Sequence, residues 1–189
     1  MPLNTIEAVQ TRYSCRDFAD QMPSDEDLQI ISEAAIAAPS GMNRQPWRII
    51  VVKNKELLAD LEAEGMKNLA ALPDKSVYER IMSRGGKLYY NAPCQIIILI
   101  AKAEPSGYEL IDCGILAENM ALAATSLGIN SLICGLAVLS FSGEKGEAFK
   151  QRLAFTEGYD IALSVLLGYA KAPDGKPHLP DQSKITVID

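Results

Sequence analysis

Hydrophobic residues along this chain follow two patterns, helical spacing in some segments and short continuous runs in others. Apolar positions three or four residues apart predict a helix from Ser24 to Ala38, with Ser24 as N-cap and Pro39 ending it. The run at 96–101 consists of Ile, Leu and Ala alone, which predicts a strand buried on both faces. Further strands are expected at 48–53, 130–136, 161–169 and 184–188, and further helices at 5–10 (capped by Asn4 or Thr5), 55–61, 108–127 and 144–153.

The predicted helix at 108–127 is apolar nearly all round. Its one polar stripe consists of Asp112, Asn119 and Ser126, seven residues apart. Such a helix lies in the centre of a large core or in a subunit interface. Charged residues within the segment argue against a membrane span. The last strand, 184–188, follows a tail rich in Pro, Gly and Asp, so we expect it to extend to a partner subunit.

Strands and helices are interspersed along the chain, which predicts an α+β fold of mixed α/β character. We expect a central sheet of four or five strands flanked by helices. Residues 65–92 are mixed and polar and contain Gly85-Gly86, so we expect a helix and a loop over one face. The length of 189 residues favours one domain, 1–189.

Composition and charge narrow the functional classes. The apolar fraction of 48% and the charged fraction of 22% are ordinary for a globular protein. The net charge of −6 argues against a nucleic-acid partner, which needs a broad basic face, although a local anion pocket built from arginines is compatible with it. The N-terminus has no basic segment followed by an apolar run, so we expect a cytoplasmic protein without a secretory signal.

Cysteine and histidine usage limits the possible chemistry. The four cysteines form no Cys-x-x-Cys pair, and we expect reduced thiols, with Cys94, Cys113 and Cys134 as small buried hydrophobes. Cys15 lies beside two arginines and could be semi-exposed, in which case they would lower the pKa of its thiol, but no histidine nearby in sequence would activate it. The only histidine, His178, argues against a His-based metal site, and we predict none. Walker, Gly-x-Gly-x-x-Gly and His-Glu-x-x-His motifs are absent.

Two N-terminal segments carry the most informative side chains. Residues 12–16 read Arg-Tyr-Ser-Cys-Arg and place two guanidiniums and a hydroxyl close together. Residues 39–47 read Pro-Ser-Gly-Met-Asn-Arg-Gln-Pro-Trp and offer hydroxyl, amide and aromatic groups in a non-helical segment. Together they suit a ligand with an anionic tail and a flat, hydrogen-bonding head, as in a phosphorylated flavin.

The two segments resemble the nitroreductase-like flavoprotein family. Residues 12–18 are similar to its Arg-x-Ser-x-Arg-x-Phe opening, and residues 38–47 to its Pro-Ser-x-x-Asn-x-Gln-Pro-Trp segment. The segment from Asp112 to Ile129 resembles the family's central helix, and Gly168-Tyr169-Ala170 resembles the end of its last core strand. The resemblance covers essentially the whole chain, with the segments in the same order.

The resemblance implies FMN as cofactor and an obligate homodimer with a flavin at the subunit interface, held by both chains. Arg12 would meet the phosphate, and Arg16 would lie near the pyrimidine edge of the ring. In the tail, His178 stands where the family often has arginine, which weakens that phosphate contact. The cofactor-binding residues implied are Arg12, Tyr13, Ser14 and Arg16; Pro39, Ser40, Gly41 and Asn43 from the other chain; Cys134, Gly135 and Leu136 on the ring face; and Lys176 and His178 in the tail.

The implied reaction is a ping-pong exchange. NADH or NADPH gives hydride to flavin N5, and an electron-poor acceptor such as a nitroaromatic or a quinone is reduced in the same place. No side chain is assigned as a catalytic acid or base. The alternatives are a related flavoprotein of dehalogenase or flavin-consuming type, a flavin-binding sensor or carrier without turnover, and a dimer without flavin whose motifs are coincidental.

Each motif residue also has an ordinary structural explanation. Arg12 and Arg16 could be solvated helix ends, and Lys176 and His178 could be tail charge. Ser40 and Asn43 are typical turn formers, and for Gln45 and Trp47 the structural interpretation is preferred. The functional interpretation rests on the conjunction of several motifs in the right order.

Overall fold

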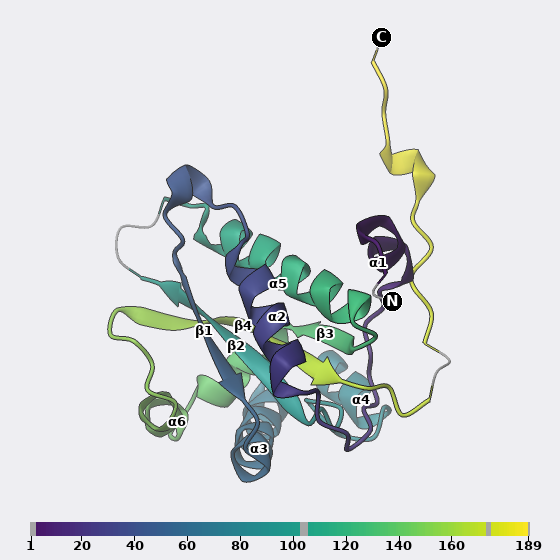
Figure 1. The fold of residues 1–189 in the computed structure, drawn as a ribbon. Coiled ribbons are helices and arrows are strands. Elements are labelled where there is room, and N and C mark those ends of the chain that lie inside the picture. The colour runs from purple at the N-terminus through teal and green to yellow at the C-terminus, as the bar shows by residue number, and fades with distance from the viewer. Residues whose placement is uncertain (1–2, 103–105, 173–174, 189) are drawn as a thin grey trace.

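A computed structural model describes residues 3–102, 106–172 and 175–188 of the chain (Figure 1). In these residues the elements follow one another as α1 (Thr5–Thr11), α2 (Asp25–Ile36), η1 (Gly41–Asn43), β1 (Trp47–Val52), α3 (Lys55–Ala71), α4 (Ser76–Met82), β2 (Cys94–Ala101), α5 (Glu109–Ser126), β3 (Asn130–Cys134), η2 (Gly135–Phe141), α6 (Gly146–Arg152), β4 (Tyr159–Gly168) and η3 (Gln182–Lys184). None of these helices has the length and apolar character that a membrane span requires.

The strands form one antiparallel sheet in the order β1-β2-β4-β3. The central strand β2 is the apolar run seen in the sequence, and its residues from Cys94 to Leu99 are all buried. Ile96 and Ile98 face one core, whereas Ile97 and Leu99 face the other, because successive side chains of a strand point to opposite sides. The predicted α+β class and the strand buried on both faces are therefore confirmed.

Helices cover both faces of the sheet (Figure 1). On one face α2 and α5 pack through Leu28, Ile31, Leu116 and Met120, all of which are buried. On the other face lie α3, α4, α6 and η2. The N-cap Ser24 accepts a hydrogen bond from the Asp27 N–H at 3.0 Å and fixes the start of α2 as predicted.

The polar stripe of α5 ties this helix to three other segments. The carboxylate of Asp112 accepts the N–H of Gly41, with its two oxygens 3.2 and 3.3 Å away. Asn119 donates to the carbonyl of Ala34, and Ser126 donates to the carbonyl of Leu3. Since α5 rises 1.5 Å per residue, η1 and the N-terminal segment contact it roughly 20 Å apart along its axis.

Several predicted boundaries are wrong. The helix expected at 55–61 continues to Ala71, and the strand expected at 130–136 ends at Cys134, where η2 begins. Residues 65–92 hold the end of α3, then α4, then a loop. Asn4 rather than Thr5 caps α1, with a capping box to Glu7.

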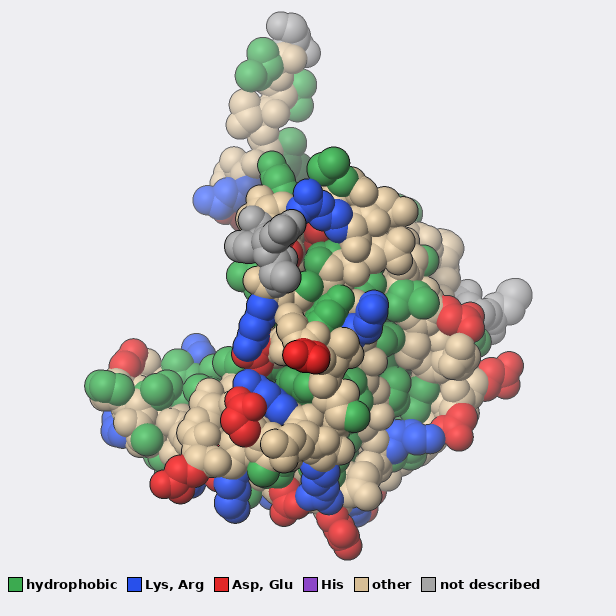
Figure 2. All heavy atoms as spheres, turned by 90° about the vertical axis from the view of Figure 1, so that its left-hand side faces the viewer, with side chains coloured by type: hydrophobic (Ala, Val, Ile, Leu, Met, Phe, Trp, Pro, Cys, Tyr) green, Lys and Arg blue, Asp and Glu red, His purple; other side chains and the backbone are tan. Residues whose placement is uncertain are grey.

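No strand forms at 184–188 among the described residues of the single chain, and the expected pairing of this segment with a partner subunit stays a prediction. The segment instead contains η3 and an extended end. Figure 2 shows this tail standing away from the body with hydrophobic side chains along it. Leu179, Ile185, Val187 and Ile188 are exposed by 94%, 69%, 78% and 90%. A strand needs a neighbour with free backbone groups, and residues 185–188 pair with no strand in the described part of this chain.

Candidate functional site

The site is organised around β3, which lies at an edge of the sheet. One side of β3 pairs with β4, and the other is covered only at its start, where Cys15 N–H donates to the carbonyl of Ser131 at 2.9 Å. The backbone polar groups of Ser131 therefore point away from β4, toward the outer edge of the sheet. Because backbone direction alternates along a strand, Ile133 directs its N–H and C=O to the same free edge. The end of β3 thus presents backbone hydrogen-bonding groups beyond the sheet.

A recess of about 270 Å³ opens at this free edge. Its floor is formed by the end of β3 and the start of η2, including Cys134, Gly135 and Leu136. Three guanidiniums line it as well, those of Arg16, Arg80 and Arg84. A Cβ at Gly135 would meet no atom within 4 Å, so the backbone there faces open space. The remaining lining residues are Ile81, Leu88, Tyr90, Leu132 and Ile133.

A second recess, of about 440 Å³, shares Arg16 with the first. Its lining consists of Tyr13 to Asp17, Ala170, Ala172, Gly175 and Lys176. The tail reaches this place because Gly175 lies directly against the Tyr13 ring, where a Cβ would come within 1.9 Å of Cε2. This close approach brings Lys176 to the same recess as Ser14 and Arg16. The structure therefore brings together seven of the predicted site residues: Tyr13, Ser14, Arg16, Cys134, Gly135, Leu136 and Lys176.

Arg12 and His178 do not line either recess. The guanidinium of Arg12 pairs instead with Glu118 on α5, with Nε 3.3 Å from Oε1. His178 is exposed in the tail. Their predicted phosphate contacts stay predictions.

The second motif lies at the opposite end of α5 from the N-terminal segment. Gly41 is held by Asp112, and Ser40 Oγ accepts the N–H of Gln45 at 2.9 Å. Met42, Asn43 and Gln45 have φ of 54°, 54° and 48°, left-handed values that cost energy for residues with a side chain. Pro39, Ser40, Gly41 and Asn43 line neither recess of this chain. Trp47 is 3% exposed, which confirms its structural interpretation.

Cys15 differs from the sequence expectation. The residue is 2% exposed, and burial raises the pKa of its thiol, although the adjacent Arg16 acts in the opposite direction. The interpretation of Cys15 as a semi-exposed thiol with a lowered pKa is therefore wrong. Burial also raises the pKa of Cys134 to about 11, so this thiol is protonated and apolar beside the recess. In the described part of the chain, no three His, Cys, Asp or Glu side chains are placed to hold a metal ion.

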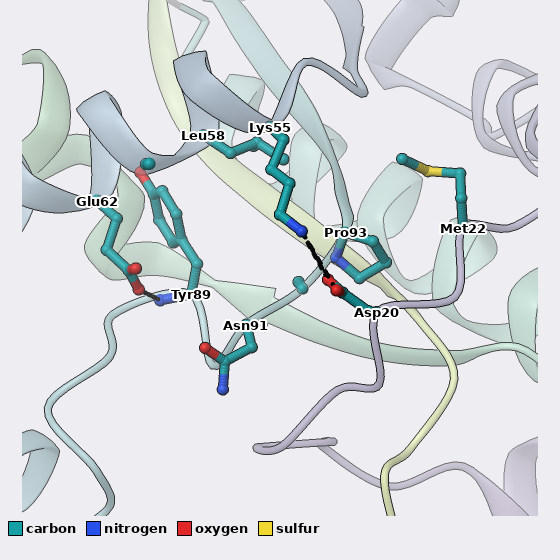
Figure 3. A pocket seen from close by; sticks show the side chains of 10 residues that line it. Asp20, Met22, Lys55, Leu58, Glu62, Tyr89, Asn91 and Pro93 are labelled. Atoms are coloured by element: carbon teal, nitrogen blue, oxygen red, sulfur yellow. Dashed lines mark hydrogen bonds and ion pairs between the residues drawn. The ribbon is translucent and has the colours of Figure 1, made fainter.

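A third recess, of about 210 Å³, lies between α3 and the loop that precedes β2 (Figure 3). An exposed ion pair between Asp20 and Lys55 crosses it at 3.1 Å. The carboxylate of Glu62 accepts the N–H of Tyr89 at 2.8 Å. None of the residues predicted from the motifs lines this recess, so the site is assigned to the two recesses that meet at Arg16.

Sequence reasoning missed Arg80 and Arg84. Both lie in the segment 65–92, whose hydrophobic residues show no regular spacing that would indicate which way its side chains face. The available signal was their spacing of four residues, which places two side chains on one face when the segment is helical.

Comparison with known proteins identifies the family of the chain. The model of the nitroreductase family matches residues 9–169, which is most of the chain. The chain belongs to the nitroreductase family. A crystal structure of a nitroreductase with bound FMN from Desulfitobacterium hafniense DCB-2 is 55% identical over the full length of both chains, with a TM-score of 0.94. A second FMN-bound nitroreductase structure, from Bacteroides fragilis, is 29% identical, covers 99% of this chain and 100% of its own, and has a TM-score of 0.87.

A curated relative of this nitroreductase-family chain comes from Archaeoglobus fulgidus and is named for NADH dehydrogenase and NAD(P)H nitroreductase activities. It is 31% identical over 169 residues, which cover 88% of this chain and 85% of the relative.

Proposed function

We propose that this chain is an NAD(P)H-dependent flavin oxidoreductase that binds FMN. The observation that carries the proposal is the recess at the free edge of β3, where Arg16 and the residues from Cys134 to Leu136 meet. Family membership and the FMN-bound relatives support the same cofactor. The names of the curated relatives support NADH or NADPH as the electron donor.

The residues of the two recesses fit such a cofactor. Lys176, Arg16 and the Ser14 hydroxyl offer an anion-binding set for the phosphate. The free backbone of β3 offers hydrogen-bonding groups for the polar edge of a flat ring. The open backbone at Gly135 and the protonated Cys134 leave a flat, weakly polar surface beside it. A cation at Arg16, shared by both recesses, would stabilise negative charge on the ring.

When bound, FMN would accept hydride from NAD(P)H and pass two electrons to an acceptor in a ping-pong sequence. The chain's own part is to bind, orient and supply charge, and no side chain is assigned as a catalytic acid or base. We propose a nitroaromatic or a quinone as acceptor. In the quinone case NAD(P)H, a proton and the quinone give NAD(P)⁺ and the hydroquinone.

We further propose that the active form is a homodimer in which η1 of each chain completes the site of the other. On the outer face of α5, Leu110, Ile111 and Ile115 are exposed by 68%, 57% and 37%, more apolar surface than one helix usually leaves to water. The apolar tail at 185–188 would pair with the partner as a strand. We also propose that 1–189 forms one domain, since one sheet carries both cores, and that the protein is cytoplasmic.

An absorption spectrum of the purified protein, followed by anaerobic titration with NADH and with NADPH, tests the proposal. We expect a yellow protein with flavin absorption that bleaches with at least one of the two donors. A preparation that stays colourless after incubation with excess FMN would exclude the cofactor. Bound flavin that neither donor bleaches would exclude the reductase and leave a sensor or carrier.

A further inference from the structure

The recess at the edge of β3 is lined by three arginines, and the proposed binding of FMN gives a role to only one of them, Arg16. Arg16, Arg80 and Arg84 line it and no carboxylate does, in a chain whose net charge is −6. Across the described residues, none of these three arginines forms an ion pair within 4.0 Å. The phosphate end of FMN is assigned to the neighbouring recess, where Lys176 joins Arg16. Arg80 and Arg84 line only the β3 recess, so their charge remains unassigned.

Both arginines stand on a well-fixed turn. Ile81 is 3% exposed and anchors α4 in the core, and Leu88, which is 0% exposed, anchors the loop that follows the helix. Gly85 and Gly86 have φ of 95° and 69°, and Gly86 N–H donates to the carbonyl of Ile81, which ends the helix with glycines in the left-handed conformation. The backbone positions of Arg80 and Arg84 beside the recess are therefore set by packing, and the two side chains are exposed.

The spacing of Arg80 and Arg84 is mildly unfavourable without an anion. The helical hydrogen bonds continue past Met82, because Ser83 N–H donates to Glu79 and Arg84 N–H donates to Ile81. Arg80 and Arg84 thus lie one turn apart on one face, and like charges at this spacing repel. A helix C-terminus favours cations, but that preference is equally satisfied by side chains directed to bulk solvent. Their common place on the recess points to a bound anion.

We propose that Arg80 and Arg84 form an anion subsite that selects an aromatic electron acceptor carrying a carboxylate. The inference rests on the proposed function and deepens it. Two neighbouring guanidiniums suit a carboxylate, which accepts paired N–H donors. The apolar walls at Leu88 and Tyr90 suit an aromatic ring. The carboxylate does not react. A quinone group takes the two electrons of NAD(P)H with two protons to give the hydroquinone, and a nitro group, NAD(P)H and a proton give the nitroso group, NAD(P)⁺ and water.

Binding of redox-inactive probes tests the subsite without turnover. Benzoate and its neutral analogue benzamide would be titrated into the oxidised, FMN-loaded enzyme by isothermal calorimetry. Arg80→Gln and Arg84→Gln would be compared with Lys145→Gln, which removes an equal charge from an exposed position outside the recess. We expect each arginine variant to raise the Kd for benzoate about threefold to tenfold and to change the Kd for benzamide little. Lys145→Gln should change neither Kd. Equal affinity of the wild type for benzoate and benzamide would overturn the proposal.

Steady-state kinetics provide the second measurement. The ratio of KM for 4-nitrobenzoate to KM for 4-nitrobenzamide should rise about tenfold in Arg80→Gln and Arg84→Gln. If the variants instead raise KM for NADPH but not for NADH and leave this ratio unchanged, the anion is the 2′-phosphate of the donor, and the acceptor proposal is wrong. If they weaken FMN binding to the apoprotein as strongly as benzoate binding, the arginines belong to the cofactor site, which also overturns it.

These outcomes are separable from failure of the proposed function. A wild-type protein that binds FMN but is not bleached by NADH or NADPH ends the reductase proposal. The calorimetric preference for benzoate over benzamide then decides the anion subsite on its own.

Discussion

The guanidinium of Arg12 lies against the carboxylate of Glu118, with Nε 3.3 Å from Oε1. Arg12 comes from the motif predicted to hold the flavin phosphate, and under that prediction Glu118 and the phosphate would compete for one cation. The Arg12 side chain is 19% exposed and that of Glu118 is 44% exposed, and an ion pair at a protein surface contributes about 0–1 kcal/mol. A charge-assisted hydrogen bond to a phosphate contributes about 1.5–3 kcal/mol, which is enough to displace Glu118.

Replacing Arg12 should therefore weaken the binding of FMN. We expect Arg12→Ala to weaken FMN binding by about 1.5–3 kcal/mol, and Glu118→Gln to strengthen it by up to about 1 kcal/mol, because the competitor is removed. Fluorescence quenching of FMN by the apoprotein gives both affinities. Arg152→Ala, which breaks the ion pair to Asp60 at 2.9 Å, serves as the control and should change neither. Unchanged flavin retention by Arg12→Ala through gel filtration would refute the phosphate assignment.

The contact between Gly175 and Tyr13 should affect FMN affinity, because it places Lys176 at the recess. A Cβ at Gly175 would overlap the Tyr13 ring, so Gly175→Ala displaces the tail and withdraws Lys176 from the recess. We expect Gly175→Ala and Lys176→Gln each to raise the Kd for FMN about tenfold, the worth of one charge-assisted contact. The double variant should be little weaker than either single one, because both remove the same contact. Additive losses would show that the tail acts independently of Lys176.

The exposed apolar face of α5 should hold two chains together. Ile111→Asp places a charge on this face and should give a monomer in analytical ultracentrifugation. Leu72→Asp, at a residue 41% exposed at the end of α3, should leave the dimer intact. If the two flavin sites are shared between chains, the Ile111 variant also loses FMN. A monomeric wild type that carries flavin would contradict the shared site.

Stability should fall in alkaline solution. Burial raises the pKa of Cys94 to about 12 and that of Cys134 to about 11, from an ordinary 9.0. Between about pH 9 and pH 11 the unfolded chain loses these thiol protons and the folded chain keeps them. The free energy of unfolding therefore falls as pH rises, by at most about 1.4 kcal/mol per pH unit for each thiol.

Urea unfolding at pH 8, 9, 10 and 11 measures this slope. Lys150, whose pKa is raised first by its hydrogen bond to Glu147, acts in the same direction at the alkaline end. The informative quantity is therefore the difference between the wild type and Cys94→Ala, which should have a flatter dependence on pH. Parallel curves for the two proteins would contradict the assignment to this thiol.

The regular part of the fold could be predicted because its signals are local. Ser24 has the side chain that an N-cap needs, and the run at 96–101 has no polar residue to place in water. Gly65 shows where local signals fail. It suggests a break within α3, yet its Cβ would come 2.5 Å from Leu88 and 2.6 Å from Ser140, so glycine is required there by packing across the fold.

The site could be predicted only in part for the same reason. Tyr13, Ser14 and Arg16 follow one another in the sequence, so a motif reveals them together. Arg80 and Arg84 join Arg16 only through the packing of α4, which no local pattern specifies. Cys15 shows the reverse error, because its neighbouring arginines suggested an accessible thiol, and the pairing of its backbone with Ser131 buries it.

The unpaired edge of β3 also bears on the behaviour of the protein in concentrated solution. A strand with free N–H and C=O groups is a template on which a strand from another molecule can add, which is how many sheets begin to aggregate. Here the three arginines stand beside that edge. Two molecules approaching edge to edge would bring six guanidiniums together, and their mutual repulsion would oppose the addition of a second strand at the edge of β3.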